Sequence, residues 1–129
     1  MEFTLESICE AHKLYTGPEF PKLIREFKAM GMVTNIYNLE TGVVSYLNKT
    51  GDSIEDKGIQ VTEIGLHSDY AAALTALKRN QRGESDFTAF CNEIAAAGIY
   101  KWVSDLEKMT CSYYDKQENA VIMENIPAV

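Results

Sequence analysis

The stretch KWVSDLEKMTCSYYDK, residues 101–116, holds most of the side-chain types that an active site uses. Cys111 is a candidate thiol nucleophile, which would need a histidine, a cation or a helix N-terminus nearby to lower its pKa. Asp105 and Asp115 are candidate paired carboxylates for acid–base chemistry. With Trp102 beside them, these groups define one hypothesis, a small enzyme of unknown reaction with a thiol and aromatic site around Cys111, Trp102 and Asp105.

The same stretch also suggests a binding surface without catalysis. Trp102 is the single tryptophan of the chain, and on a hairpin it would lie beside tyrosines in a shallow aromatic groove. Which tyrosine faces it depends on the register of the hairpin, which the sequence leaves open. The weak candidates for binding residues are Tyr100, Trp102, Ser104, Asp105, Cys111 and Tyr114.

Metal and cofactor motifs are not found in the sequence. The three cysteines, Cys9, Cys91 and Cys111, are an odd number without metal-type spacing, and neither His12 nor His67 has a spacing that ties it to a cysteine. There is no phosphate-binding glycine loop and no serine-hydrolase elbow. We therefore expect no metal and no cofactor, and favour a protein without catalytic activity over an enzyme.

The length and net charge of the chain limit the number of its domains and the kinds of partner that it can bind. A chain of 129 residues fits one domain, 1–129, and its net charge of −7 repels phosphate backbones and anionic lipid surfaces. We expect neither nucleic acid nor a membrane as partner. The acidic N-terminal stretch and the free thiols favour a cytoplasmic location.

The chain contains two copies of one pattern. The apolar helical stripe that starts at Phe20 recurs at Phe87, displaced by 67 positions, and nine of the 35 positions compared at this offset are identical. The identical pairs are Phe20/Phe87, Glu26/Glu93, Ala29/Ala96, Gly31/Gly98, Leu39/Leu106, Glu40/Glu107, Ser45/Ser112, Tyr46/Tyr113 and Lys49/Lys116. We infer an internal duplication with pseudo-repeats at approximately 1–66 and 67–129.

Each copy predicts two helices followed by three strands. We predict helices over 4–15, 20–30, 69–82 and 87–97, hairpin strands over 32–39, 43–49, 99–106 and 110–116, and third strands near 59–64 and 120–126. The segment 51–58 is expected to be a loop. The fold class is α+β, ααβββ-ααβββ, with an antiparallel sheet of about six strands and four helices packed on it.

Glycine and hydroxyl residues predict how the elements end. Gly31 and Gly98 suit the left-handed position that closes a helix, and Ser68 and Ser85 are expected to be the N-caps of the third and fourth helices. The first hairpin turn contains the sequence ETG, whereas the second contains EKM, which has no glycine and is expected to use a different turn.

The duplication separates scaffold from candidate function. Residues shared by both copies, such as Ser112 and Tyr113, are expected to serve the hairpin. If function breaks the symmetry, it should use groups found in the second copy alone. These are Trp102, Asp105, Cys111, Tyr114 and Asp115, which stand where the first copy has Asn35, Asn38, Val44, Leu47 and Asn48.

Three stretches carry a family resemblance: GPEFPKLIREFKAMG, FCNEIAAAGIYKWV and MTCSYYDK. Together they resemble the small bacterial proteins called YbcV-like, a domain family of unknown function sometimes labelled phage envelope protein. The likeness runs over nearly the whole chain. It implies a bacterial, often prophage-associated single domain without established activity, and it assigns no catalytic residues.

The leading interpretation is a non-enzymatic binding or interaction module. Its aromatic sheet face or sheet edge would contact a protein, a small molecule or a second copy of the chain in a homodimer. The small enzyme described above is the alternative. A third hypothesis, a phage-encoded inhibitor of a host nucleic-acid-binding protein, would make use of the charge of −7.

Overall fold

The computed structural model describes residues 2–15 and 19–128. Its elements are α1 (Leu5–Leu14), α2 (Phe20–Ala29), β1 (Met32–Asn38), β2 (Val43–Asn48), β3 (Ser53–Lys57), α3 (Tyr70–Gln81), α4 (Phe87–Ala96), β4 (Ile99–Asp105), β5 (Thr110–Asp115) and β6 (Ala120–Asn125). This order confirms the α+β class and the duplicated ααβββ pattern.

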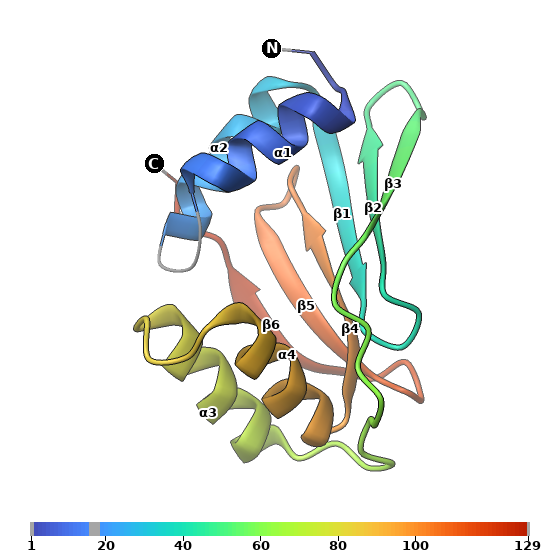
Figure 1. Ribbon diagram of the computed structural model, residues 1–129, viewed down its shortest axis with the longest axis vertical. Coiled ribbons are helices and arrows are strands. Elements are labelled where there is room, and N and C mark those ends of the chain that lie inside the picture. Colours follow the sequence, from blue (N-terminus) through green and yellow to red (C-terminus); the bar gives the residue numbers. More distant parts are fainter. Residues whose placement is uncertain (1, 16–18, 129) are drawn as a thin grey trace.

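The six strands form one antiparallel sheet in the order β3-β2-β1-β4-β5-β6. The two copies therefore meet at the centre of the sheet, where β1 pairs with β4. Both helix pairs lie on the same side of the sheet, α1 and α2 over one half of its length and α3 and α4 over the other (Figure 1). The opposite side of the sheet is called the outer face.

The duplication extends to the pairing of individual residues. In the first hairpin Ile36 pairs with Ser45, and in the second Val103 pairs with Ser112, each 67 positions later. A bulge interrupts β1 between Met32 and Thr34 and β4 between Ile99 and Lys101, again at equivalent positions. The same backbone geometry has thus been built twice from different side chains.

The helices bury equivalent apolar stripes against the inner face of the sheet. Leu23, Ile24 and Phe27 of α2 are buried, and Phe90, Cys91 and Ile94 occupy the same positions in α4. Full burial of one such large side chain stabilises a fold by about 1.5–3 kcal/mol. These stripes hold both helix pairs on the sheet.

Two expected N-caps prove wrong by one residue. Asp69 and Asp86 cap α3 and α4, and their carboxylates accept hydrogen bonds from the backbone N–H groups of Ala72 and Ala89. Ser68 and Ser85 precede them. A carboxylate is the better acceptor at the positive end of a helix, which explains why aspartate takes the position.

The expectation of a different second turn is also wrong. Met109 has φ +55°, in the left-handed region, and lies at the position equivalent to Gly42, which has φ +75°. The expected closing glycines are confirmed, since Gly31 and Gly98 have φ +90° and +93°. A non-glycine residue in this region costs about 1 kcal/mol, which the surrounding hairpin must offset.

One strand lies where a loop was predicted. β3 occupies Ser53–Lys57, inside the segment 51–58, and pairs with β2, whereas the predicted strand near 59–64 belongs to the connection between β3 and α3. This connection, residues 58–69, is called the linker below. Its apolar residues Ile59, Val61 and Ile64 pack individually against the core without a strand partner.

Candidate functional site

The residues proposed from the sequence do not meet at one site. Trp102, Ser104 and Cys111 lie on the inner face of the sheet, beneath the helices, and are 7%, 0% and 3% exposed. Tyr114 lies on the outer face, because it alternates with the buried Tyr113 along β5. The sheet itself separates Tyr114 from the other three.

Trp102 belongs to an aromatic cluster in the core. Its ring stacks on Tyr37 at 4.7 Å between centroids, and it packs against Phe90 at 5.5 Å and Tyr113 at 5.8 Å. The register therefore places Tyr113 opposite Trp102. The aromatic groove expected from the sequence is an element of core packing, with Phe87 at its exposed end.

Cys111 has the surroundings of a structural thiol. Its Sγ accepts a hydrogen bond from the Ser104 hydroxyl at 3.6 Å, and burial raises the pKa of the Cys111 thiol. Burial likewise raises the pKa of Cys91 to about 12. A nucleophilic thiol requires a shift in the opposite direction. The geometry gives Cys111 no activating partner for acyl-transfer or redox chemistry.

Asp105 and Asp115 serve two turns at opposite ends of the β4–β5 hairpin. The Asp105 carboxylate accepts hydrogen bonds from the backbone N–H groups of Glu107 and Lys108, both at 3.0 Å. The Asn38 side chain does the same for Glu40 and Thr41 in the first copy.

Asp115 has the same role in its turn as Asn48, the equivalent residue of the first copy. Its carboxylate accepts from the backbone of Gln117 and Asn119, and these hydrogen bonds lower the pKa of Asp115. Asn48 accepts from the backbone two and four residues further on. The two aspartates are therefore turn residues and not a catalytic pair.

The outer face carries few charges. Its central positions, on the four strands β1, β2, β4 and β5, are all half-buried and alternate with the buried inner residues. They are Val33, Thr34, Ile36, Asn38, Val43, Ser45, Leu47, Tyr100, Lys101, Val103, Asp105, Thr110, Ser112 and Tyr114. Among these positions, all within the described part of the chain, Lys101 and Asp105 are the charged side chains. The four helices pack on the other side.

The positive charge of Lys101 is neutralised by a neighbouring carboxylate. Its ammonium lies 2.9 Å from the Glu118 carboxylate and over the rings of Tyr100 and Tyr114, at 5.3 Å and 5.2 Å from their centroids. Tyr100 also donates its hydroxyl proton to Glu118. The first copy has Val33, Thr34, Leu47 and Gly51 at these four positions, so this aromatic and cationic cluster is specific to the second copy.

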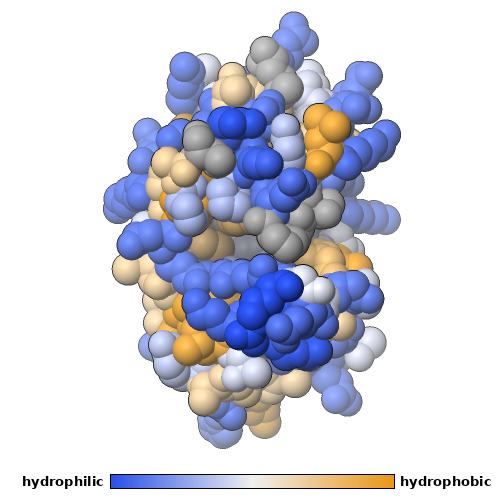
Figure 2. All heavy atoms as spheres, turned by 90° about the vertical axis from the view of Figure 1, so that its left-hand side faces the viewer, coloured by the Kyte–Doolittle hydropathy of each residue, from blue (hydrophilic) through white to orange (hydrophobic). Residues whose placement is uncertain are grey.

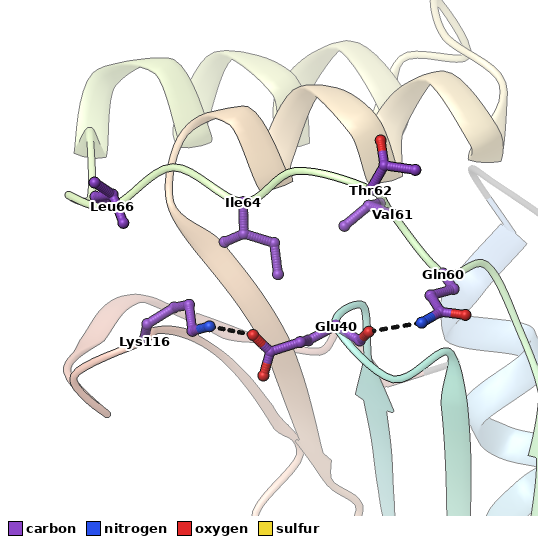
Figure 3. Close-up of a pocket in the computed structure, with 7 residues that line it drawn as sticks. All are labelled: Glu40, Gln60, Val61, Thr62, Ile64, Leu66 and Lys116. Carbon is purple, nitrogen blue, oxygen red and sulfur yellow. Dashed lines mark hydrogen bonds and ion pairs between the residues drawn. The ribbon is translucent and has the colours of Figure 1, made fainter.

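A hollow of about 630 Å³ lies between the linker and the turns at one end of the sheet. Its lining combines polar and apolar groups: Glu40, Gln60, Val61, Thr62, Ile64, Leu66 and Lys116. Glu40, in the β1–β2 turn, forms an ion pair with Lys116, in the β5–β6 turn, so both copies contribute to it. Figure 3 shows this pair below Ile64, which points into the hollow from the linker.

Sequence reasoning missed this hollow for an identifiable reason. Glu40 and Lys116 are identical in both copies, with Glu107 and Lys49 as their counterparts, and were therefore assigned to the scaffold. Gln60 and Ile64 lie in the segment where a strand was expected, and Leu66 follows it. Leu66, an apolar residue outside any apolar periodicity, is the one signal in the sequence, and in the structure its side chain is 78% exposed.

Among the residues that the structure describes, the helix-bearing side shows no comparable surface. Figure 2 views this side, where hydrophilic residues cover most of the helices and apolar ones appear in separate spots. The basic residues Arg79 and Arg82 form ion pairs with Glu93 and Glu84. In residues 2–15 and 19–128 no three His, Cys, Asp or Glu side chains are grouped so as to hold a metal ion. No helix in these ranges has both the length and the apolar character that crossing a bilayer needs.

Comparison with known proteins gives a family without an assigned activity. The sequence model of the family described as "Protein of unknown function (DUF1398)" matches residues 10–125. The chain is similar to uncharacterized protein Mb2035 of Mycobacterium bovis and uncharacterized protein Rv2012 of Mycobacterium tuberculosis. Each is 31% identical over 114 residues, which is 85% of this chain and 68% of the mycobacterial protein. These names assign no substrate or partner, so any function must be argued from the geometry.

Proposed function

Because the chain belongs to the family of unknown function DUF1398, we propose its function from the geometry: it is a non-catalytic interaction domain that forms a homodimer through the outer face of its sheet. The observation that carries this proposal is the depletion of charge on that face. A quarter of the residues in the chain are charged, 24%, yet the central outer positions hold only Lys101 and Asp105. Charge depletion with enrichment of aromatic residues such as tyrosine is the compositional sign of an interface core.

Self-association suits this face for an electrostatic reason. Two copies that each carry a net charge of −7 repel one another wherever carboxylates meet. The carboxylate of Asp105, at the end of β4, accepts hydrogen bonds from the backbone N–H groups of Glu107 and Lys108, and the ammonium of Lys101 is already paired with Glu118. Two outer faces can therefore approach without opposing unpaired like charges, which supports a second copy as the partner.

The size of the face is also sufficient. Six strands spaced by about 4.8 Å, with about six residues each at about 3.3 Å, span close to 600 Å² in projection. The relief of the side chains raises the accessible area above this value. A standard interface buries about 800 Å² on each partner, so a dimer of this size uses the outer positions of all six strands, with the charged Glu55 and Lys57 of β3 at its rim.

The non-catalytic part of the proposal is supported by the positions of the candidate groups. Cys111 is a buried thiol with a raised pKa, and Asp105 and Asp115 satisfy turns. The cytoplasmic location belongs to the same proposal and is supported by the free thiols of Cys9, Cys91 and Cys111. The prophage association implied by the YbcV-like resemblance also belongs to it, and rests on that resemblance alone.

Analytical ultracentrifugation across protein concentration tests the homodimer. We expect a species of twice the chain mass of 14.5 kDa. Ile36→Lys should weaken the dimer by about 100-fold or more, because it places an unpaired charge at the centre of the interface. Tyr70→Lys, at an exposed apolar position on α3, is the matched control and should leave the dimer intact. A wild-type chain that stays monomeric at high concentration, or equal effects of both variants, would overturn the proposal.

A further inference from the structure

We propose that the hollow beside the linker binds a small zwitterion with an apolar side chain, of the class of the aliphatic α-amino acids. This site is independent of the outer face. A volume of about 630 Å³ lies within the range of small-ligand sites, about 300–1,000 Å³.

The linker is held at both ends, so the hollow is part of the fold. Gly58 donates its N–H to the carbonyl of Gly42 at 2.7 Å, and Val61 donates to Leu39 at 3.0 Å. At the other end Gly65 donates to Ala95 at 2.9 Å. Between Val61 and Gly65 the chain arches away from the turns, which leaves the space open (Figure 3).

Close packing at the anchor points reinforces this arrangement. A Cβ atom on Gly65 would lie 2.7 Å from the carbonyl oxygen of Ala96, and one on Gly42 would lie 2.9 Å from the Cβ of Gln60. Such contacts exclude a side chain at either glycine. The linker is therefore pressed against α4 at one end and against the β1–β2 turn at the other.

The polar side of the hollow presents opposite charges next to each other. The Glu40 carboxylate and the Lys116 ammonium are paired and are 46% and 40% exposed. The Gln60 amide donates to the Glu40 carbonyl at 3.1 Å, which holds the turn toward the linker. Both charged groups are partly exposed, so a ligand in the hollow can reach them.

The chemistry of the ligand follows from these groups. An α-ammonium group would pair with Glu40 and an α-carboxylate with Lys116, and both are charge-assisted hydrogen bonds. The apolar side chain would lie under Ile64 and beside Leu66, which is 78% exposed. A zwitterion has no net charge, so the overall charge of −7 does not repel it.

Titration of the ¹⁵N-labelled chain with L-leucine, followed by NMR, tests the site. We expect saturable shifts of the backbone amides of Thr62, Ile64 and Glu40. 4-Methylpentanoate lacks the ammonium group and 3-methylbutylamine lacks the carboxylate, so each should bind at least about tenfold more weakly. Glycine, without an apolar side chain, should also bind more weakly.

The duplication supplies matched controls. Lys116→Met and Glu40→Gln should each weaken leucine binding about tenfold or more, whereas Lys49→Met and Glu107→Gln, the same changes at the equivalent positions of the other copy, should not. All four side chains lie in surface turns, and circular dichroism checks that each variant is folded. Shifts that do not saturate, equal binding of the singly charged analogues, or equal effects in both copies would overturn the proposal.

Discussion

Ile36 and Val103 pair with each other across the β1–β4 ladder, and each occupies the same position in its own half of the chain. A pseudo-twofold axis therefore passes between them. The neighbouring pairs exchange as this symmetry requires: Asn35 pairs with Ser104, and their equivalents Trp102 and Tyr37 pair with each other. The axis gives every site on the sheet a counterpart in the other half.

Asp105 can be tested as a turn residue. Asp105→Asn should leave the free energy of unfolding within about 0.5 kcal/mol of wild type, because Asn38 performs the same function in the first copy. Asp105→Ala should lower it by about 1 kcal/mol through the loss of two backbone hydrogen bonds. Urea denaturation measures both values. A catalytic or binding role for the charge would instead show as a change of function in Asp105→Asn with unchanged stability.

Trp102 and Val103 are adjacent but face opposite sides of the sheet. Trp102→Ala should lower the free energy of unfolding by about 3–5 kcal/mol, because it leaves a cavity between α4 and the sheet. Val103→Ala should cost about 1 kcal/mol at concentrations that keep the chain monomeric, since Val103 is only half-buried.

The intrinsic fluorescence of Trp102 checks the same assignment in wild-type protein. The single tryptophan should emit at short wavelength and resist quenching by iodide, because the ring is 7% exposed. Free access of iodide to the ring would place Trp102 on the surface and contradict the inner-face assignment.

The thiols should react in the order of their exposure. Cys9 is half-buried, whereas Cys91 and Cys111 are buried and burial raises the pKa of both. We expect a neutral aromatic disulfide reagent to label Cys9 first and to reach the other two only on unfolding. The variant Cys9→Ser isolates the buried pair. Rapid labelling of this variant below neutral pH would restore Cys111 as a candidate nucleophile.

His12 predicts a dependence of stability on acid pH. Burial lowers the pKa of His12, and the nearby Asp56 carboxylate raises it by a smaller amount. Because the pKa in the folded state lies below that in the unfolded state, His12 contributes stability that is fully present above pH 6.5, its ordinary value, and is lost as the pH falls from there through the lower pKa of the folded state.

Removal of the Asp56 carboxylate tests how burial and this carboxylate together set the pKa of His12. Asp56→Asn should lower the pKa of His12 further, as measured by NMR titration of the imidazole protons. Glu55→Gln is the matched control, because Glu55 pairs with Ser45 on the outer face and should have a smaller effect. A rise in the pKa of His12 in Asp56→Asn would contradict this assignment.

The elements and their duplication were predictable because both depend on local patterns. The stripe that buries Leu23, Ile24 and Phe27 is repeated 67 positions later with the same spacing, and the offset also fixes which hairpin positions correspond. β3 was not predictable in this way. Its sequence SIEDK is polar and lies at the edge of the sheet, where pairing with β2 and not burial defines the strand.

The candidate site was less predictable than the fold, since it depends on which face each strand residue occupies. The sequence placed Trp102, Cys111 and Tyr114 on one hairpin, but the hairpin register decides that Tyr114 lies on the opposite side from the other two. The hollow depends on the path of the linker, which has no periodic pattern. Its charged residues, Glu40 and Lys116, come together through contacts between segments 76 positions apart.

The ladder between β1 and β4 has a further consequence for the origin of the chain. If either half were made alone, its seven-residue central strand would become a free edge, whose unpaired N–H and C=O groups invite a second polypeptide. Two identical halves would pair these edge strands with each other, and their N–H and C=O groups would form the same twofold ladder in which Ile36 and Val103 now pair. The present protein thus has the architecture of an ancestral dimer fused into one polypeptide, in which each half has since been free to diverge.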